Sequence, residues 1–131
     1  MDPRLRQRVR DRARNRCEYC HLPQSAIRVQ LQVEHIIALQ HRGASVEENL
    51  ALACDRCNLH KGTNLSAIDP ATDQVVRLFH PRTDDWEAHF LPVGAEIVGQ
   101  TPEGRATVRL LEFNTTQRLQ LREDLIAVGE W

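Results

Sequence analysis

All four cysteines of this 131-residue chain lie in two Cys-X-X-Cys motifs, and 33 residues separate the two motifs. The first motif holds Cys17 and Cys20, and the second holds Cys54 and Cys57. Each such turn supplies two thiolates, so two turns can converge on one tetrahedral Zn²⁺ about 2.3 Å from each sulfur. A single motif would also suit a redox pair or buried thiols, but two motifs that use every cysteine favour zinc. Because four thiolates leave no open position, this zinc is expected to be structural.

A second set of residues has the chemistry needed to hydrolyse a phosphodiester bond. Such hydrolysis requires a group that takes a proton from water, a cation at the phosphate and relief of charge at the departing 3′ oxygen. His35 can accept a proton near neutral pH, because the unperturbed pKa of imidazole is about 6.5. Glu34 and Asn58 offer hard oxygen ligands, which favour Mg²⁺ or Mn²⁺ over a softer ion. For a lone histidine, a core residue satisfied by hydrogen bonds would be the alternative.

The order of these residues resembles the zinc-bearing branch of the HNH endonuclease family, whose fold is the ββα-metal motif. Val33-Glu-His-Ile36 stands between the cysteine motifs, Asn49 comes 14 residues after its histidine, and Asn58 directly follows the second motif. The resemblance is clearest over residues 17–62. Residues 76–114 also look like a C-terminal extension found in many small bacterial HNH proteins, which suggests kinship but no chemistry.

The resemblance implies a catalytic site with a separate divalent cation. It makes His35 the general base, and it makes Glu34 and Asn58 the ligands of one Mg²⁺ or Mn²⁺. It also implies that the amide of Asn49 braces the loop that carries the base. Asn58 occupies the place of the last histidine in the family's name, so His60, two residues further on, is a substitute candidate for a metal ligand.

Basic residues in the first half of the chain are candidates for contact with DNA phosphates. Lys61, the only lysine, occupies the lysine position of the family motif, and an exposed surface lysine is the alternative. Arginine stands at every even position from 4 to 16, and a solvated helix face is the alternative there. The arginines expected to bind nucleic acid are Arg4, Arg8, Arg12 and Arg16.

Charge is distributed unevenly along a chain whose formal net charge is only −1. Residues 1–62 carry ten Arg, one Lys and seven acidic residues, a net charge of +4, whereas residues 63–131 carry six Arg and eleven acidic residues, a net charge of −5. The basic half is therefore where a polyanion is expected. Apolar residues make up 41% and charged residues 27% of the chain, as in globular proteins. The longest apolar run is five residues and the N-terminus lacks the apolar segment of a signal peptide, so a cytoplasmic protein without a membrane partner is expected.

Local patterns predict the elements that position these residues. Asp2 as N-cap and Pro3 as first residue predict an N-terminal helix. Alternating apolar residues predict a half-buried strand over residues 28–36. Ser45-Val-Glu-Glu48 resembles a capping box that opens a short helical turn. Residues 55–62 are expected to form a short helix that ends at their last residue, a glycine.

The second half of the chain is expected to extend the core and to carry no chemistry. The elements predicted there are a strand over 74–79, a helical turn over 84–90, hairpin strands over 96–100 and 105–111, and a helix over 115–128. Thr-Pro-Glu-Gly is predicted as the turn of the hairpin, and Asn114 as the cap of the last helix.

Together these expectations describe one α+β domain over residues 1–131. Residues 1–65 are expected to hold the Arg-rich helix and a ββα-metal core stabilised by the Cys₄ zinc site, and residues 66–131 a β-hairpin plus helix extension packed on it. The expected activity is that of a metal-dependent HNH endonuclease that hydrolyses DNA phosphodiester bonds. One site per chain cuts one strand, so a homodimer is expected only if both strands are cut.

Two other classes of protein share some of these features. A non-catalytic zinc-knuckle nucleic-acid-binding module would use the arginines to hold phosphates and would break no bond. A zinc-stabilised adaptor for other proteins would use the acidic second half. Neither class needs a Glu-His pair followed by two asparagines at the family spacing, and this distinction favours the nuclease.

Overall fold

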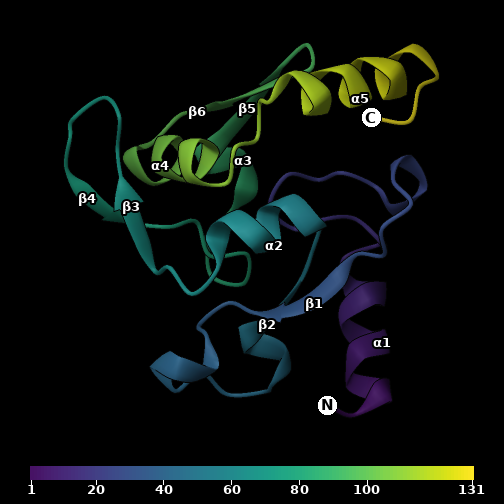
Figure 1. Ribbon diagram of the computed structural model, residues 1–131, viewed down its shortest axis with the longest axis vertical. Helices are drawn as coiled ribbons and strands as arrows, with labels where there is room; N and C mark the ends of the chain where they lie inside the picture. Colours follow the sequence, from purple (N-terminus) through teal and green to yellow (C-terminus); the bar gives the residue numbers. More distant parts are fainter. The chain divides into compact units, whose positions relative to one another are not determined.

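Short helices and two-stranded antiparallel sheets alternate along residues 1–131, all of which the computed structural model describes (Figure 1). The expected α+β class is therefore confirmed. The chain divides into two units, each with its own interior. Unit 1 comprises Met1–Thr63 with His80–Thr83, and unit 2 comprises Asn64–Phe79 with Asp84–Trp131. That the second half packs on the first as one domain stays a prediction. None of the helices is both long and apolar enough to cross a membrane.

Unit 1 is built around a two-stranded sheet and the helix that follows it. Strand β1 (Gln32–His35) pairs with β2 (Leu50–Ala53), with Gln32 opposite Ala53 and His35 opposite Leu50. Helix α2 (Asp55–Lys61) follows β2 directly and packs against β1, while α1 (Pro3–Arg12) packs against both strands (Figure 1). The order β1, β2, α2 is the ββα arrangement that the sequence predicted.

The predicted start of α1 is confirmed, and its cause is local. Oδ1 of Asp2 accepts a hydrogen bond from the backbone N–H of Arg4 at 2.8 Å, and Pro3 occupies the first turn, where its missing N–H costs nothing. Val9 is completely buried and anchors the helix to the sheet. The helix ends at Arg12.

Two sequence predictions in unit 1 are wrong in detail. The strand predicted over residues 28–36 is reduced to β1, because its partner β2 ends where Cys54 becomes the N-cap of α2. The preceding residues are held by the side chain of Gln24, which accepts from the Leu31 N–H at 2.7 Å. The capping box also fails: a 3₁₀ turn runs over Glu47–Asn49 without a side-chain cap, and the Ser45 hydroxyl instead contacts His35.

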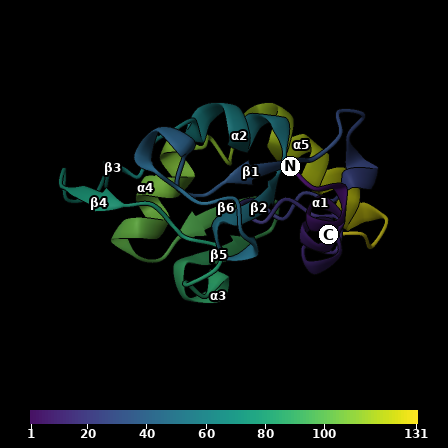
Figure 2. The same cartoon turned by 90° about the horizontal axis from the view of Figure 1, so that it is seen from below.

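Unit 2 consists of two hairpins and three helices. In chain order they are β3 (Ser66–Ile68), β4 (Val75–Arg77), α3 (Trp86–His89), β5 (Phe90–Val93), β6 (Glu96–Gly99), α4 (Pro102–Leu110) and α5 (Thr116–Ala127). β3 pairs with β4 and β5 with β6. The ribbon of β5 and β6 lies beside α4 in both views (Figures 1 and 2). The interior is aromatic: the Phe90 ring centroid lies 5.1 Å from that of Phe79, 5.0 Å from that of Trp86 and 5.5 Å from that of Phe113.

The predicted hairpin of residues 96–100 with residues 105–111 is wrong, because the second of these segments is helical. Thr101 caps α4 by accepting a hydrogen bond from the Gly104 N–H at 3.0 Å, and Pro102 is its first residue. Gly104 does not form a turn. A Cβ at this position would lie 2.2 Å from the His89 carbonyl oxygen, so glycine is required for close packing.

The cap of the last helix lies one residue later than predicted, and the helix also begins one residue later, at Thr116. Thr115, rather than Asn114, caps α5 by accepting from the Arg118 N–H at 3.2 Å. The Asn114 amide instead accepts from the Ile97 N–H and donates to the Ile97 carbonyl, at 2.9 and 2.8 Å. Asn114 therefore ties β6 to the start of α5, and a side chain that looks like a cap in the sequence serves a long-range contact.

Candidate functional site

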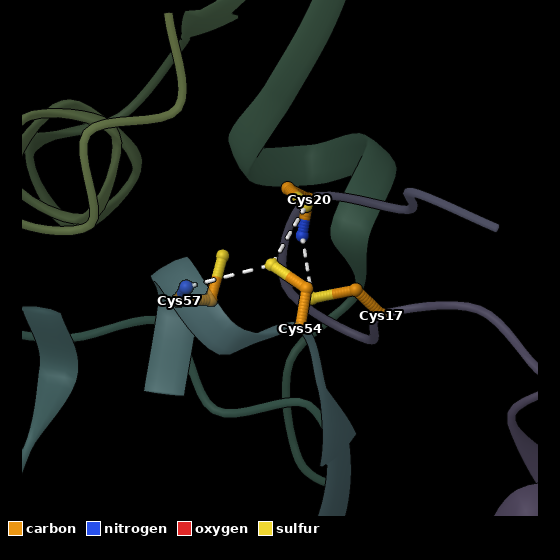
Figure 3. A group of neighbouring side chains, drawn as sticks. All are labelled: Cys17, Cys20, Cys54 and Cys57. Atoms are coloured by element: carbon orange, nitrogen blue, oxygen red, sulfur yellow. Dashed lines mark hydrogen bonds between the residues drawn. The ribbon is translucent and has the colours of Figure 1, made fainter. Parts of the chain in front are cut away.

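The two cysteine motifs meet in unit 1 as predicted. The four side chains are buried, and their Sγ atoms all lie within 4.8 Å of one another, facing a common space between the first motif and the start of α2 (Figure 3). The Sγ atoms of Cys20 and Cys54 are 3.8 Å apart. A tetrahedral ion with bonds of about 2.3 Å separates its sulfur ligands by about 3.8 Å, so the cluster has the dimensions of a zinc site.

Backbone groups and burial also suit a metal in this cluster. The Cys20 N–H donates to Cys17 Sγ and the Cys57 N–H donates to Cys54 Sγ, both at 3.5 Å (Figure 3). These donors stabilise negative charge on sulfur. Burial raises the pKa of the Cys17 thiol well above its ordinary value, so thiolates here need a cation to offset the loss of hydration. The donor set therefore fits Zn²⁺, and all four positions are taken by protein.

Glu18, inside the first motif, attaches that motif to its surroundings. Its Oε2 accepts from the Leu52 N–H of β2 at 2.8 Å and lies 3.7 Å from the Arg12 guanidinium. Its other oxygen forms an ion pair with Arg82, which explains why residues 80–83 belong to unit 1. Sequence reasoning missed this residue, because nothing in the motif distinguishes it from a surface acid.

Glu34, the predicted metal ligand, lies in a buried polar cluster. The Tyr19 hydroxyl donates to Glu34 Oε1 at 2.5 Å, and the Lys61 ammonium lies 4.0 Å from Oε2. Burial raises the pKa of Glu34, and the charge of Lys61 and the Tyr19 hydrogen bond oppose that shift. Tyr19 therefore links the first cysteine motif to the candidate catalytic residues, a connection that the sequence did not reveal.

Lys61 has its partners inside the protein, and its contact with a phosphate stays a prediction. Its side chain is 3% exposed, and its Nζ donates to the Ile36 carbonyl oxygen at 2.8 Å as well as lying near Glu34. Burial lowers the pKa of Lys61, and the negative charge of Glu34 raises it. The ammonium points into the protein because the last turn of α2 packs over β1, so the structure gives Lys61 an internal electrostatic partner.

His35 ends β1 and is half-buried. Its Nε2 lies 2.8 Å from Oγ of Ser45, a residue in the loop that follows β1. Adjacent residues of a strand point to opposite faces, and Glu34 and His35 accordingly have different partners. The Ser45 hydroxyl orients the imidazole ring through Nε2, so the second ring nitrogen, Nδ1, is not used in this hydrogen bond.

Asn49 closes the loop between β1 and β2 by means of its side-chain amide. Its Oδ1 accepts from the Ile37 N–H at 2.9 Å, and its Nδ2 donates to the carbonyl oxygens of Ile37 and Ala44 at 3.0 and 2.9 Å. Gly43 permits this closure, because a Cβ there would lie 1.7 Å from the Ile37 carbonyl oxygen and 2.7 Å from Asn49 Nδ2. Ile37, two residues after His35, is thus tied to the loop that carries Ser45.

The two predicted ligands of a catalytic cation come from facing elements. Asn58 on α2 donates to Gln32 Oε1 at 3.3 Å, and Gln32 lies on the same face of β1 as Glu34. A carboxylate and an amide are donors that Mg²⁺ and Mn²⁺ accept, so the chemistry of the pair fits such an ion. His60 lies two residues after Asn58, and helix positions two apart do not face each other. The structure therefore does not bring His60 to Asn58.

The four arginines expected to bind nucleic acid have partners within the protein. Arg4 pairs with Asp2, and Arg8 forms an ion pair with Glu47. The remaining two donate to backbone carbonyl oxygens: Arg12 to Glu47 and Leu50 at 3.0 and 2.6 Å, and Arg16 to His21 at 3.1 Å. The guanidinium groups at 8 and 12 therefore hold α1 against the loop before β2.

Comparison with known families agrees with this arrangement. The family model described as HNH endonuclease matches residues 17–64, which include both cysteine motifs, β1, β2 and α2. Comparisons with curated proteins and with solved structures found no match. The resemblance inferred from the motifs is confirmed over residues 17–64, which are similar to the HNH endonuclease family.

Proposed function

We propose that this protein is a metal-dependent endonuclease that hydrolyses phosphodiester bonds of DNA. The match of residues 17–64 to the HNH endonuclease family model supports nuclease activity in general. The observation that carries the finer proposal is the half-buried His35 at the end of β1, oriented by Ser45 in a loop that Asn49 holds closed.

In this proposal His35 takes a proton from the attacking water. With Nε2 occupied by the Ser45 hydroxyl, Nδ1 is the nitrogen that accepts the proton. Asn49 acts through the loop. Its hydrogen bonds to Ile37 and Ala44 hold the backbone near His35 and the backbone next to Ser45 in a fixed relative position. General-base catalysis of this kind typically contributes about 10²–10⁴-fold in rate.

Glu34 and Asn58 would hold the catalytic Mg²⁺ or Mn²⁺. Such an ion supplies positive charge at the scissile phosphate and at the departing 3′ oxygen. The chain's own contribution is to hold the carboxylate: the Tyr19 hydroxyl and the Lys61 ammonium restrain Glu34 from two sides. The Cys₄ zinc has no part in the reaction, since protein fills its four positions.

Cleavage of supercoiled plasmid tests the proposal. Wild-type protein with its zinc retained should cut plasmid when Mg²⁺ or Mn²⁺ is added and not in their absence. His35→Ala should lower the rate by about 10²–10⁴-fold with zinc content unchanged. His41→Ala is the matched control, because His41 is an exposed histidine in the loop after β1, and it should cut at the wild-type rate. If His35→Ala cuts as fast as wild type, His35 is not the general base.

One observation favours a second candidate, the non-catalytic zinc-knuckle nucleic-acid-binding module. The Glu34 carboxylate already has the Tyr19 hydroxyl and Lys61 as partners, so it is satisfied without a cation. A binding module would retain plasmid on a gel but would leave it uncut with Mg²⁺, Mn²⁺ or both. Metal-dependent cutting that disappears in His35→Ala would exclude it.

A further inference from the structure

A polar groove runs between α1 and the segment that leads into β1. It consists of two adjoining hollows of about 670 and 280 Å³, which share Arg10 and Gln30 in their lining. The first extends to Arg14 and Arg28, and the second to Arg6 and Gln32. We call the two hollows together the α1 groove; it lies entirely within unit 1.

The lining of the α1 groove suits a polyanion. Four arginines and five side-chain amides line it, with Asp11 as the single acid and no aromatic residue. Guanidinium groups bind phosphate oxygens with several N–H donors at once, and amides both donate and accept hydrogen bonds at sugar and base edges. Asp11 is the only lining residue with a side chain that commonly ligates a metal, and Leu31 and Val33 are the only apolar lining residues. A nucleic-acid backbone matches the chemistry of the remaining side chains.

The two groove arginines of α1 lie on a different face of the helix from the two arginines that bind the turn before β2. Arg6 and Arg10 are four residues apart and therefore neighbours on one helical face, whereas Arg8 and Arg12 reach the 3₁₀ turn before β2. Arg10 crosses the groove floor and gives one of its five N–H donors to the Leu31 carbonyl oxygen at 2.8 Å. Further N–H donors of Arg10 are thus left for a ligand.

Beyond the end of α1, the backbone adopts an unusual conformation at the rim of the groove. Arg14 and the next residue, Asn15, both line the groove, and both have left-handed φ angles of 53° and 56°. Such angles are uncommon for residues other than glycine. The Asn15 N–H donates to the Arg10 carbonyl at 3.1 Å, which keeps this turn folded back on the helix.

The α1 groove adjoins the candidate catalytic residues along β1. Gln32 and Val33, the first residues of β1, line the second hollow, and Gln32 also contacts Asn58. At about 3.3 Å per residue, Gln32 and His35 are about 10 Å apart along the strand. This distance corresponds to about three nucleotide steps of B-form DNA, at about 3.4 Å each.

We propose that the α1 groove binds the sugar-phosphate backbone of the DNA strand next to the bond that is cut. The statement that a bond is cut next to the groove rests on the proposed function. Binding of DNA in the groove is measured separately from cleavage. The arginines responsible are Arg6, Arg10, Arg14 and Arg28, which differ from the set that the sequence favoured.

The test measures duplex-DNA affinity against salt, without cleavage. A fluorescent 20-base-pair duplex is titrated with the zinc-loaded His35→Ala protein in the absence of Mg²⁺ and Mn²⁺. The groove variant adds Arg6→Gln and Arg28→Gln, two exposed residues from opposite sides of the groove. The control variant adds Arg42→Gln and Arg109→Gln, which remove the same charge at exposed positions outside the groove.

The groove variant should bind more weakly and should lower the slope of log affinity against log salt by about 1.8, because each lost phosphate contact removes about 0.9. Arg6→Lys with Arg28→Lys should restore the slope. The control variant should keep the slope of log affinity against log salt within about 0.5 of the slope of the parent protein. Equal slopes for parent and groove variant, or equal losses in groove and control variants, would overturn the assignment. Tight groove-dependent binding by a wild-type protein that never cuts DNA would overturn the nuclease proposal and leave the groove intact.

Discussion

At the scale of single residues, the partners of Glu34 account for the positions of Tyr19 and Lys61. A buried carboxylate is costly unless hydrogen bonds or a counter-charge replace its hydration. The Tyr19 hydroxyl and the Lys61 ammonium supply both, and Lys61 also satisfies the Ile36 carbonyl. Lys61 therefore has a structural task, whatever its part in binding DNA.

Lys61→Met should destabilise the protein. The change removes a charged hydrogen bond to a buried carbonyl oxygen, and such bonds contribute about 1.5–3 kcal/mol. Denaturant unfolding of the zinc-loaded protein would measure this loss, and Arg109→Met, at an exposed position, should change stability by less than about 0.5 kcal/mol. A Lys61→Met protein of wild-type stability, with a salt slope for DNA binding lowered by about 0.9, would instead support direct phosphate contact.

At the scale of elements, polar side chains lock hairpins to helices. In unit 2 the carboxylate of Asp69, which follows β3, is fully buried and accepts from Arg105 of α4 at 2.9 and 2.8 Å. It also accepts from the Ala71 N–H at 3.1 Å and the Thr72 hydroxyl at 2.9 Å. The β3–β4 turn and α4 therefore share one ionised group, and the hydrogen bond from Arg105 is the main cause that lowers the pKa of Asp69.

Unit 2 should lose stability in acid as Asp69 takes up a proton. Because the folded pKa lies below the unfolded value of about 3.9, this contribution is complete above about pH 4. It disappears as the pH falls further, towards the lowered pKa. Trp86 and Trp131 both belong to unit 2, so tryptophan fluorescence during acid titration reports on this unit. Asp69→Asn should be less stable at neutral pH and less sensitive to acid. An identical acid profile for Asp69→Asn and wild type would contradict this role.

At the scale of the whole molecule, the metal-binding cysteines and the arginine-lined groove lie in the same unit. The Cys₄ cluster, the candidate catalytic residues and the α1 groove all lie in unit 1. Unit 2 has an aromatic interior of its own. Zinc binding in small domains is worth about 10–16 kcal/mol, as much as the whole stability of a typical domain.

Removal of zinc should therefore unfold unit 1. After treatment with a strong chelator, or in Cys54→Ser, backbone amides of Cys17–Thr63 should lose protection in hydrogen exchange, while the strands of β5 and β6 in unit 2 keep theirs. Mass spectrometry of peptides from the full chain would follow both units at once. Undiminished protection of Cys17–Thr63 in the metal-free protein would show that the cluster is not a folding zinc site.

The sequence by itself determined those features whose causes are local or shared by a family. Asp2 and Pro3 start α1 because a cap acts over two or three residues. The spacing of the cysteines predicted their cluster, and the order of motifs predicted the HNH family, which the comparison confirmed over residues 17–64. The catalytic roles of His35 and Asn49 stay predictions.

Only the tertiary structure decided which of several suitable partners each polar side chain has. Alternating arginines look equivalent in the sequence, yet Arg8 and Arg12 hold the loop before β2 while Arg6 and Arg10 line a groove. The sequence predicts Lys61 beside a phosphate and does not indicate its internal partner, but packing of α2 over β1 brings it to Glu34. The reason is physical: caps depend on neighbours along the chain, whereas burial and ion pairing depend on segments tens of residues away, whose approach no local pattern encodes.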